Sequence, residues 1–329
     1  MLDFMKKERN LFQLLILVVV IFILMSAVNP GKFLTLRNFE SMSFQFPEFG
    51  ILSIAMMLAM LTGGIDLSIV GIANLAGILA ALILTKGIPE TASGTVIIVM
   101  SLVAVLTAIL AGIACGILNG ILIAHLEITP ILATLGTMEL FTGISIVITR
   151  GSAINTYPEE FVFLGNGLIW IFPVPVIIFT VMAIVFAIIL RRTMFGINLY
   201  MMGTNPTAAR FSGIDNAKVL IETYLLTGLL AGVAGIVMIA RSNSARADYG
   251  SSYILQSILI AVLGGVSPSG GFGTIFGVVL AILSLQFLSS GFNMLRFNNF
   301  AKELTWGLFL LLVMVLNYLM NARQAKRKT

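Results

Sequence analysis

Charged side chains are scarce in this sequence. Asp, Glu, Lys and Arg make up 10% of the 329 residues, hydrophobic residues make up 59%, and the mean hydropathy is +1.07. Soluble domains carry roughly a quarter charged residues. The chain therefore has too little polar surface for a soluble globule, and we expect it to cross a membrane several times.

Cysteine and histidine are almost absent. Cys115 and His125 are single occurrences, so an internal disulfide and a Cys/His metal cluster are both excluded. A membrane-embedded enzyme would need a nucleophile and base or a metal constellation, and neither is present. We predict no catalytic residue, no metal and no cofactor on this chain.

The net charge of +5 does not form a basic patch. Lys and Arg instead stand at the ends of apolar segments, which argues against a nucleic-acid partner and for membrane topology. Basic residues cluster in the first ten residues, in the segment 191–218 and at the C-terminus. Because short basic segments stay in the cytoplasm, we predict a multi-pass membrane protein with both termini cytoplasmic.

Apolar runs predict about ten transmembrane helices in a single all-α membrane domain spanning 1–329. At about 20 residues per span, the expected segments are 11–28, 42–62, 69–84, 95–124, 131–148, 168–190, 219–240, a short 254–263, 274–288 and 303–320. Pro173 and Pro175 would lie inside the sixth of these. Gly112, Gly116 and Gly120 recur every four residues in the fourth, which predicts close packing against a neighbouring helix.

The segment 191–218 is a polar island between two apolar runs. Within it we predict a short helix that begins at Asn205-Pro206, because Pro is favoured in the first helical turn, and that ends near Gly213. A solvated linker is the simpler interpretation of such a loop. The alternative is a rigid contact for a partner, in which the small residues Ala208 and Ala209 fit a cleft.

Three segments resemble the ribose-type permease family of ABC importers. They are Gly63-Gly64-Ile65-Asp66-Leu67-Ser68, the stretch from Gly203 to Ile214, and 261–273 with its Gly264-Gly265 and Gly270-Gly271-Phe272-Gly273. The last lacks the Gly-Lys-Ser/Thr ending of a Walker A loop. Where family members usually have an Arg-Gly pair, this chain has Thr142-Gly143, so no role of that arginine carries over.

The resemblance implies a type II ABC-importer-like bundle in the bacterial inner membrane, together with its partners. These are a second permease copy or homologue, two cytoplasmic ATPases that carry ATP and Mg, an external solute-binding protein, and membrane lipid. The cargo would be a monosaccharide or a similar small polar solute. The island would be the ATPase-coupling loop, with contacts expected at Gly203, Asn205, Ala208, Ala209, Arg210, Ser212, Gly213 and Ile214.

Polar residues inside the apolar segments are candidates for the translocation path. They are Asp66, Ser68, Asn74, Asn119 and Glu139. An ionisable group at membrane depth is a functional candidate by default. The structural alternatives are that Asp66 caps the next helix and that Glu139 only fixes helix packing.

Two loops are predicted to face the outside and to dock the binding protein. Their charged residues are Arg150, Glu159 and Glu160 in the first, and Arg241, Arg246 and Asp248 in the second. A self-sufficient secondary transporter is the alternative function. It would be expected to carry several embedded ionisable residues for ion coupling, and the sequence indicates only Asp66 and Glu139.

Overall fold

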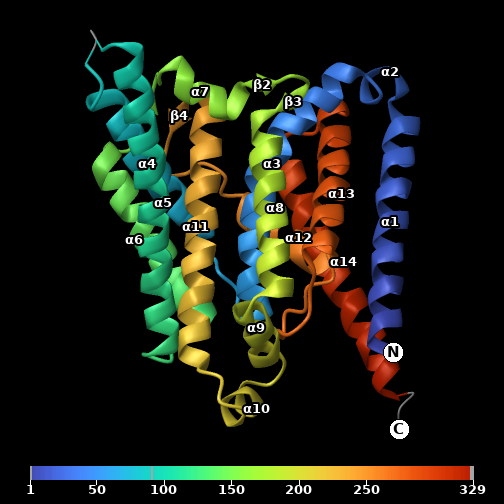
Figure 1. Cartoon of the computed structure of the whole chain (residues 1–329). Coiled ribbons are helices and arrows are strands. Elements are labelled where there is room, and N and C mark those ends of the chain that lie inside the picture. The colour runs from blue at the N-terminus through green and yellow to red at the C-terminus, as the bar shows by residue number, and fades with distance from the viewer. Residues whose placement is uncertain (1, 90–91, 327–329) are drawn as a thin grey trace.

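The computed structural model describes residues 2–89 and 92–326, and this part of the chain is mostly helical, with almost no strand (Figure 1). The helices are α1 Leu2–Val28, α2 Pro30–Phe33, α3 Leu36–Leu61, α4 Ile69–Lys86, α5 Gly94–Ala124, α6 Pro130–Thr149, α7 Glu159–Asn166, α8 Val174–Arg192, α9 Met194–Thr204, α10 Pro206–Phe211, α11 Asn216–Ser242, α12 Tyr253–Leu263, α13 Ile275–Met294 and α14 Asn299–Lys326. The all-α prediction is confirmed.

Four strands of two residues each form two small antiparallel pairs. β1 (Ile154–Asn155) pairs with β4 (Ser244–Ala245), and β2 (Leu168–Ile169) pairs with β3 (Phe172–Pro173). The first pair joins segments that are far apart in sequence. The second is a local hairpin at the start of α8.

Eight helices in the described residues are long and apolar enough to cross a membrane. They are the Leu11–Val28 part of α1, and α3, α4, α5, α6, α8, α11 and α13. Two more helices, the shorter α12 and the C-terminal α14, correspond to the remaining predicted segments. The side chains of the basic residues in both tails lie outside the described residues.

The bundle has two distinct ends (Figure 1). The start of α1 and the end of α14 lie at the end that carries α9 and α10, which we call the α10 end. The helix α7 and the strands β2, β3 and β4 lie at the opposite end, which we call the α7 end. The polar island thus lies at the same end of the bundle as the start of α1 and the end of α14.

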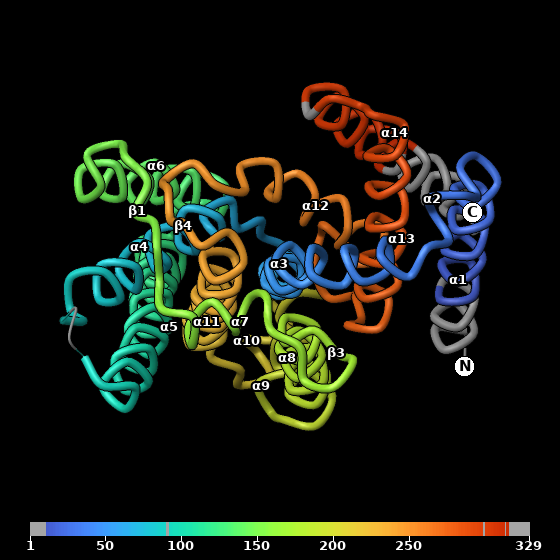
Figure 2. The backbone as a smooth tube through the Cα atoms, turned by 90° about the horizontal axis from the view of Figure 1, so that it is seen from above, coloured from blue at the N-terminus to red at the C-terminus, as the bar shows by residue number. Residues whose placement is uncertain are grey.

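The centre of the bundle is formed by α3 and α11. In the most apolar 18 residues of each helix, 83% of the residues are buried. Seen from above, they lie inside the outline, while α6, α1 and α14 lie at its edge (Figure 2). A β-carbon at Gly112 would meet the backbone of Gly232 at 3.1 Å, and one at Gly116 would meet Gly228 at 3.1 Å. The predicted glycine face of α5 therefore packs directly on α11.

Two predicted segments have different limits in the structure. The second span, expected at 42–62, begins earlier as α3 at Leu36, where the Thr35 side chain accepts a hydrogen bond from the Asn38 amide (3.3 Å). The sixth span begins at Val174 and not at 168. Pro173 lies in β3, and Pro175 lies in the first turn of α8, where a missing amide proton costs nothing.

Candidate functional site

The short helix predicted in the polar island is present as α10. The Ala208 amide donates to Asn205 Oδ1 (3.0 Å), Pro206 is the first helical residue, and Gly213 takes a positive φ of +83° after the helix ends. The Ser212 hydroxyl donates to the Ala208 carbonyl (3.0 Å). Local sequence thus fixes a rigid turn of helix beyond the last apolar residues of α8.

The two faces of α10 differ sharply. Ala209 is 2% exposed and packs in the main hydrophobic core, whereas Phe211 is 89% exposed. Ala208 and Arg210 are exposed as well. We expected Ala208 and Ala209 together to enter a partner's cleft, but the structure turns Ala209 toward the chain itself and leaves Ala208, Arg210 and Phe211 available.

Gly203, in the last turn of the preceding helix α9, packs against two glycine-containing turns, one after α3 and one between α12 and α13. Gly203 touches the carbonyl of Leu61 at the end of α3, and a β-carbon at Gly270 would lie 2.6 Å from the Gly203 carbonyl oxygen and 2.9 Å from the Gly63 nitrogen. The Gly271 amide donates to the Leu61 carbonyl (3.0 Å). We call this contact the glycine junction.

Tyr200 adds a side-chain tie to the same place. Its hydroxyl donates to the Gly273 carbonyl (2.8 Å), which fastens α9 to the turn between α12 and α13. Burial raises the pKa of Tyr200 to about 12, outweighing the opposite influence of Arg191. The hydroxyl therefore keeps its proton, and its capacity to donate, at neutral pH.

A fully buried polar cluster surrounds Asp66. Asp66 Oδ1 accepts hydrogen bonds from the Ser68 hydroxyl (2.6 Å) and the Ser68 amide (3.0 Å), and Oδ2 accepts one from the Thr227 hydroxyl on α11 (2.9 Å). Asn119 Nδ2, on α5, donates to Ser68 Oγ (2.7 Å). Asp66 thus joins the turn between α3 and α4 to α11, and Ser68 joins that turn to α5.

The expectation that Asp66 caps α4 is wrong in detail. The N-cap of α4 is Ser68, which makes no side-chain capping hydrogen bond, and Asp66 binds within its own turn and to α11 instead. Thr134 on α6 holds the same turn, because its hydroxyl accepts from the Leu67 amide (3.1 Å).

The remaining two path candidates lie elsewhere. Asn74 Nδ2 donates to the carbonyls of Ala247 and Tyr249, both at 2.9 Å, and so holds the loop after β4. Glu139 is exposed on α6, near the middle of that 20-residue helix. Of the five candidates, only Asp66, Ser68 and Asn119 come together.

The residues predicted to dock a binding protein gather at the α7 end, except for one side chain. Glu159 and Glu160 form the first turn of α7, Arg150 ends α6 with a left-handed φ of +53°, and Arg246 pairs with Asp248 at 2.9 Å. These five residues are exposed. Arg241 instead turns inward to Glu48 of α3.

The pair of Glu48 and Arg241 is a feature that the sequence analysis missed. Glu48 is 2% exposed, Arg241 Nη2 donates to Glu48 Oε2 (3.1 Å) while Nε donates to Oε1, and the Tyr253 hydroxyl donates to Oε2 (2.8 Å). Three helices, α3, α11 and α12, therefore meet at one carboxylate. The sequence feature that could have indicated this pair is a Glu within an apolar run. The embedded ionisable residues are therefore more than Asp66 and Glu139, the two that the sequence indicated.

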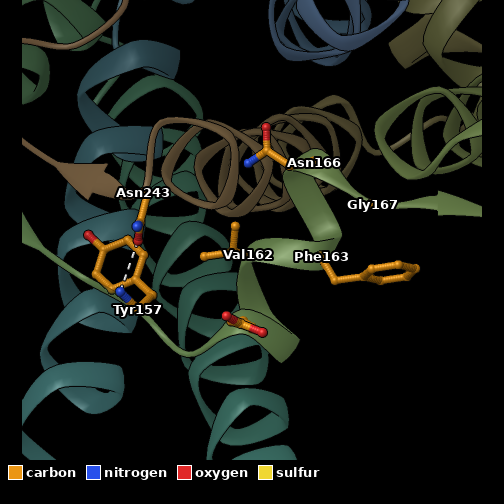
Figure 3. A pocket seen from close by; sticks show the side chains of 7 residues that line it. Tyr157, Val162, Phe163, Asn166, Gly167 and Asn243 are labelled. Atoms are coloured by element: carbon orange, nitrogen blue, oxygen red, sulfur yellow. Dashed lines mark hydrogen bonds between the residues drawn. The ribbon is translucent and has the colours of Figure 1, made fainter.

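A shallow recess of about 470 Å³ lies beside α7. Its lining comes from α7 and the adjoining segments: Tyr157, Glu159, Val162, Phe163, Asn166, Gly167 and Asn243 (Figure 3). The Tyr157 amide donates to Asn243 Oδ1 (2.8 Å), and Asn166 Nδ2 donates to the Ala240 carbonyl (2.9 Å). Two of the lining residues, Tyr157 and Asn166, are thus hydrogen-bonded to the C-terminal end of α11.

Comparison with known proteins identifies relatives over nearly the whole length. Residues 38–317 match the family model described as branched-chain amino acid transport system / permease component. The chain is 34% identical to the ribose import permease protein RbsC of Bacillus subtilis, over 91% of this chain and 89% of that one. It is 33% identical to RbsC of Escherichia coli K12, over 94% and 93% of the two chains.

A relative with a different name is nearly as similar. The autoinducer 2 import system permease protein LsrD of Yersinia enterocolitica is 31% identical, over 81% of this chain and 79% of that one. No solved structure matches the chain. These relatives are permease proteins of import systems and not enzymes. The helical bundle, the apolar spans and the matched 38–317 lead to one conclusion: the chain belongs to this family of membrane transport permeases, whose ATP hydrolysis resides on separate subunits.

Proposed function

We propose that this chain is the membrane-spanning subunit of an ABC importer for a monosaccharide or a similar small polar solute. In this proposal two cytoplasmic ATPases grip α10, an external binding protein delivers the solute to the α7 end, and a second permease copy completes the path. The names of the ribose and autoinducer 2 permeases support this class of cargo.

The observation that carries the proposal is the connection between α10 and the glycine junction. α10 presents Phe211 to the surroundings at the tip of a rigid, capped helix, and the only residue between α9 and α10 is the cap, Asn205. Gly203 on α9 touches Leu61, the last residue of α3, and Gly270, within the turn between α12 and α13. A push on α10 is therefore passed through α9 to the end of α3 and to the turn that precedes α13.

Close backbone contact is what makes this connection stiff. Interiors packed without voids transmit displacement, whereas solvated loops absorb it. In this proposal the ATPase cleft receives Phe211 as an aromatic anchor and Arg210 as a donor for charge-assisted hydrogen bonds. The α10 end, with both termini, then lies in the cytoplasm.

Glu139 supports the part of the proposal that concerns a second permease copy. A carboxylate at the centre of a helix facing lipid costs about 2.5–3.5 kcal/mol, yet Glu139 is exposed on α6. Gly136 and Gly143 flank it, and a β-carbon at either would meet nothing within 4 Å. We assign this face of α6 to the contact with the second copy or to the wet path beside it.

Reconstitution tests the proposal. Proteoliposomes that contain the permease and its ATPase should take up the solute when ATP is supplied inside, if the binding protein is added outside. Proteoliposomes with the permease alone should take up nothing. Uptake without any ATPase subunit would refute the importer mechanism and return the chain to the secondary-transporter alternative.

A further inference from the structure

An exposed apolar hairpin stands at the α7 end, immediately before α8. β2 and β3 pair Leu168 with Pro173 and Ile169 with Phe172, and Trp170 at the turn has a positive φ of +60°. The turn holds Trp170 95% exposed and Ile171 78% exposed. Leu168, Ile169 and Phe172 are between 45% and 56% exposed. We call residues 168–172 the apolar hairpin.

The backbone of this hairpin is well tied, so its exposure is not that of a frayed loop. The Val174 amide donates to the Gly167 carbonyl (3.0 Å), which closes the base of the hairpin. Gly167 follows Asn166, whose side chain bonds to the end of α11. A rigid scaffold therefore presents five apolar side chains to the surroundings, and such a patch marks an interaction surface.

We propose that the apolar hairpin inserts into the lipid interface of the membrane leaflet at the α7 end. No charged residue occurs between Glu160 and Arg191 in the sequence, so the hairpin offers nothing with which a charged protein surface would pair. Trp is enriched where acyl chains meet headgroups, because its ring is apolar and its N–H is polar. Trp170 lies four residues before the first residue of a span, at that level of the bilayer.

Continuity with the lipid-facing side of α8 supports the same assignment. Val181, Ile184 and Ile188 on α8 are 51–54% exposed, and this helix starts directly after the hairpin. From above, β3 lies at the rim of the molecule beside α8 (Figure 2). The hairpin therefore extends an apolar surface that already faces lipid, and it holds the neighbouring α7, with Glu159 and Glu160, at the membrane surface.

Tryptophan fluorescence in lipid nanodiscs tests this placement, because the chain has only two tryptophans, Trp170 and Trp306. Trp306→Phe leaves Trp170 as the reporter and keeps an aromatic ring against Phe292. Bromine on lipid chains quenches a tryptophan in the bilayer, and iodide quenches one in water. A matched control carries Trp170→Phe, Trp306→Phe and Phe211→Trp, which moves the reporter to the exposed position on α10.

We expect Trp170 to lose most of its emission to lipids brominated near the headgroup, less to lipids brominated deep in the chain, and little to iodide. The control should show the reverse. Quenching of Trp170 by iodide and not by bromine would overturn the proposal and favour docking of a soluble protein. Resistance to both quenchers would overturn it in favour of a contact between copies. If Trp306→Phe does not fold, the difference in quenching between the unaltered protein and Trp170→Phe gives the same answer.

Discussion

Gly203 lies directly against the main-chain carbonyl of Leu61, with no room between them for a β-carbon. This contact joins the last turn of α9 to the last turn of α3, and Gly271 donates its amide to the same carbonyl. The middle of the polar island is thus anchored to α3, and its last residues already belong to α11, which begins at Asn216. The relationship explains why glycine occupies position 203, where the helix alone would favour alanine.

Gly203→Ala should disrupt the junction. The added methyl must displace the Leu61 carbonyl, and forcing extra volume into a packed site costs about 1–3 kcal/mol. We expect a lower thermal unfolding temperature in detergent and reduced ATP-driven uptake. Gly307→Ala on α14 is the control, because a β-carbon there meets nothing within 4 Å. Equal unfolding temperatures for the two variants would show that the junction is loose.

The two faces of α10 predict opposite phenotypes for two acidic substitutions. Ala209→Glu places a carboxylate in the chain's own core and should lower the unfolding temperature of the isolated permease. Phe211→Asp changes a side chain that is 89% exposed and should leave that temperature unchanged. Differential scanning fluorimetry distinguishes them. A stable Ala209→Glu protein would mean that Ala209 is not part of the core.

The sequence predicts α10 well because its signals are local. Asn205, Pro206 and Gly213 each act within one turn of helix, and a polar island between apolar runs must lie outside the membrane. The direction of Ala209 could not be predicted in the same way. It depends on how α10 rests on the ends of other helices, which a helix of six residues does not reveal through periodicity.

The start of the sixth span, by contrast, was predicted wrongly from the sequence. Hydropathy alone cannot separate the exposed 168–172 from the helix that follows, because both are apolar. Pro173 and Pro175 carried the better signal, since proline is favoured at the start of a helix. Glu48 was predictable in kind, as a carboxylate in an apolar run, but its partner Arg241 is 193 residues away and is brought there only by the packing of α3 against α11.

Thr227→Val should destabilise the Asp66 cluster. The substitution keeps the shape of the side chain but removes the donor to Asp66 Oδ2, and a buried acceptor left unsatisfied costs about 1–3 kcal/mol. Thr227→Ser keeps the hydroxyl donor and should therefore retain most of the stability that Thr227→Val loses. A double-mutant cycle with Asp66→Ala isolates the pair, and additive effects would show that the two side chains do not interact.

Labelling from each side of the membrane checks the topology. In a Cys115→Ala background, a cysteine at Ser152 should react with an impermeant thiol reagent added outside, because Ser152 is exposed at the α7 end. A cysteine at Thr207, exposed on α10, should react only from the cytoplasmic face. We choose Ser152 over Ser244, whose hydroxyl bonds to Asn155 and Tyr249. Reversed labelling would invert the assignment of both ends.

The exposed face of α6 should bring two copies together. In the same background, Gly136→Cys places a thiol one turn from Glu139, and mild oxidation should give a cross-linked dimer on a non-reducing gel. Ile184→Cys on α8 is the control on a face that we assign to lipid. Dimer formation at position 184 but not at 136 would move the contact between copies to α8.

Co-purification of the ATPase tests the central claim most directly. The tagged permease is extracted in mild detergent together with its co-expressed ATPase, and Mg-dependent ATP hydrolysis per permease is measured for the unaltered protein, Phe211→Asp and Gly307→Ala. We predict that the unaltered protein and Gly307→Ala carry ATPase activity and that Phe211→Asp, though folded, carries almost none. Equal activity with Phe211→Asp and with the unaltered protein would contradict the assignment of α10 as the contact through which the ATPase drives transport.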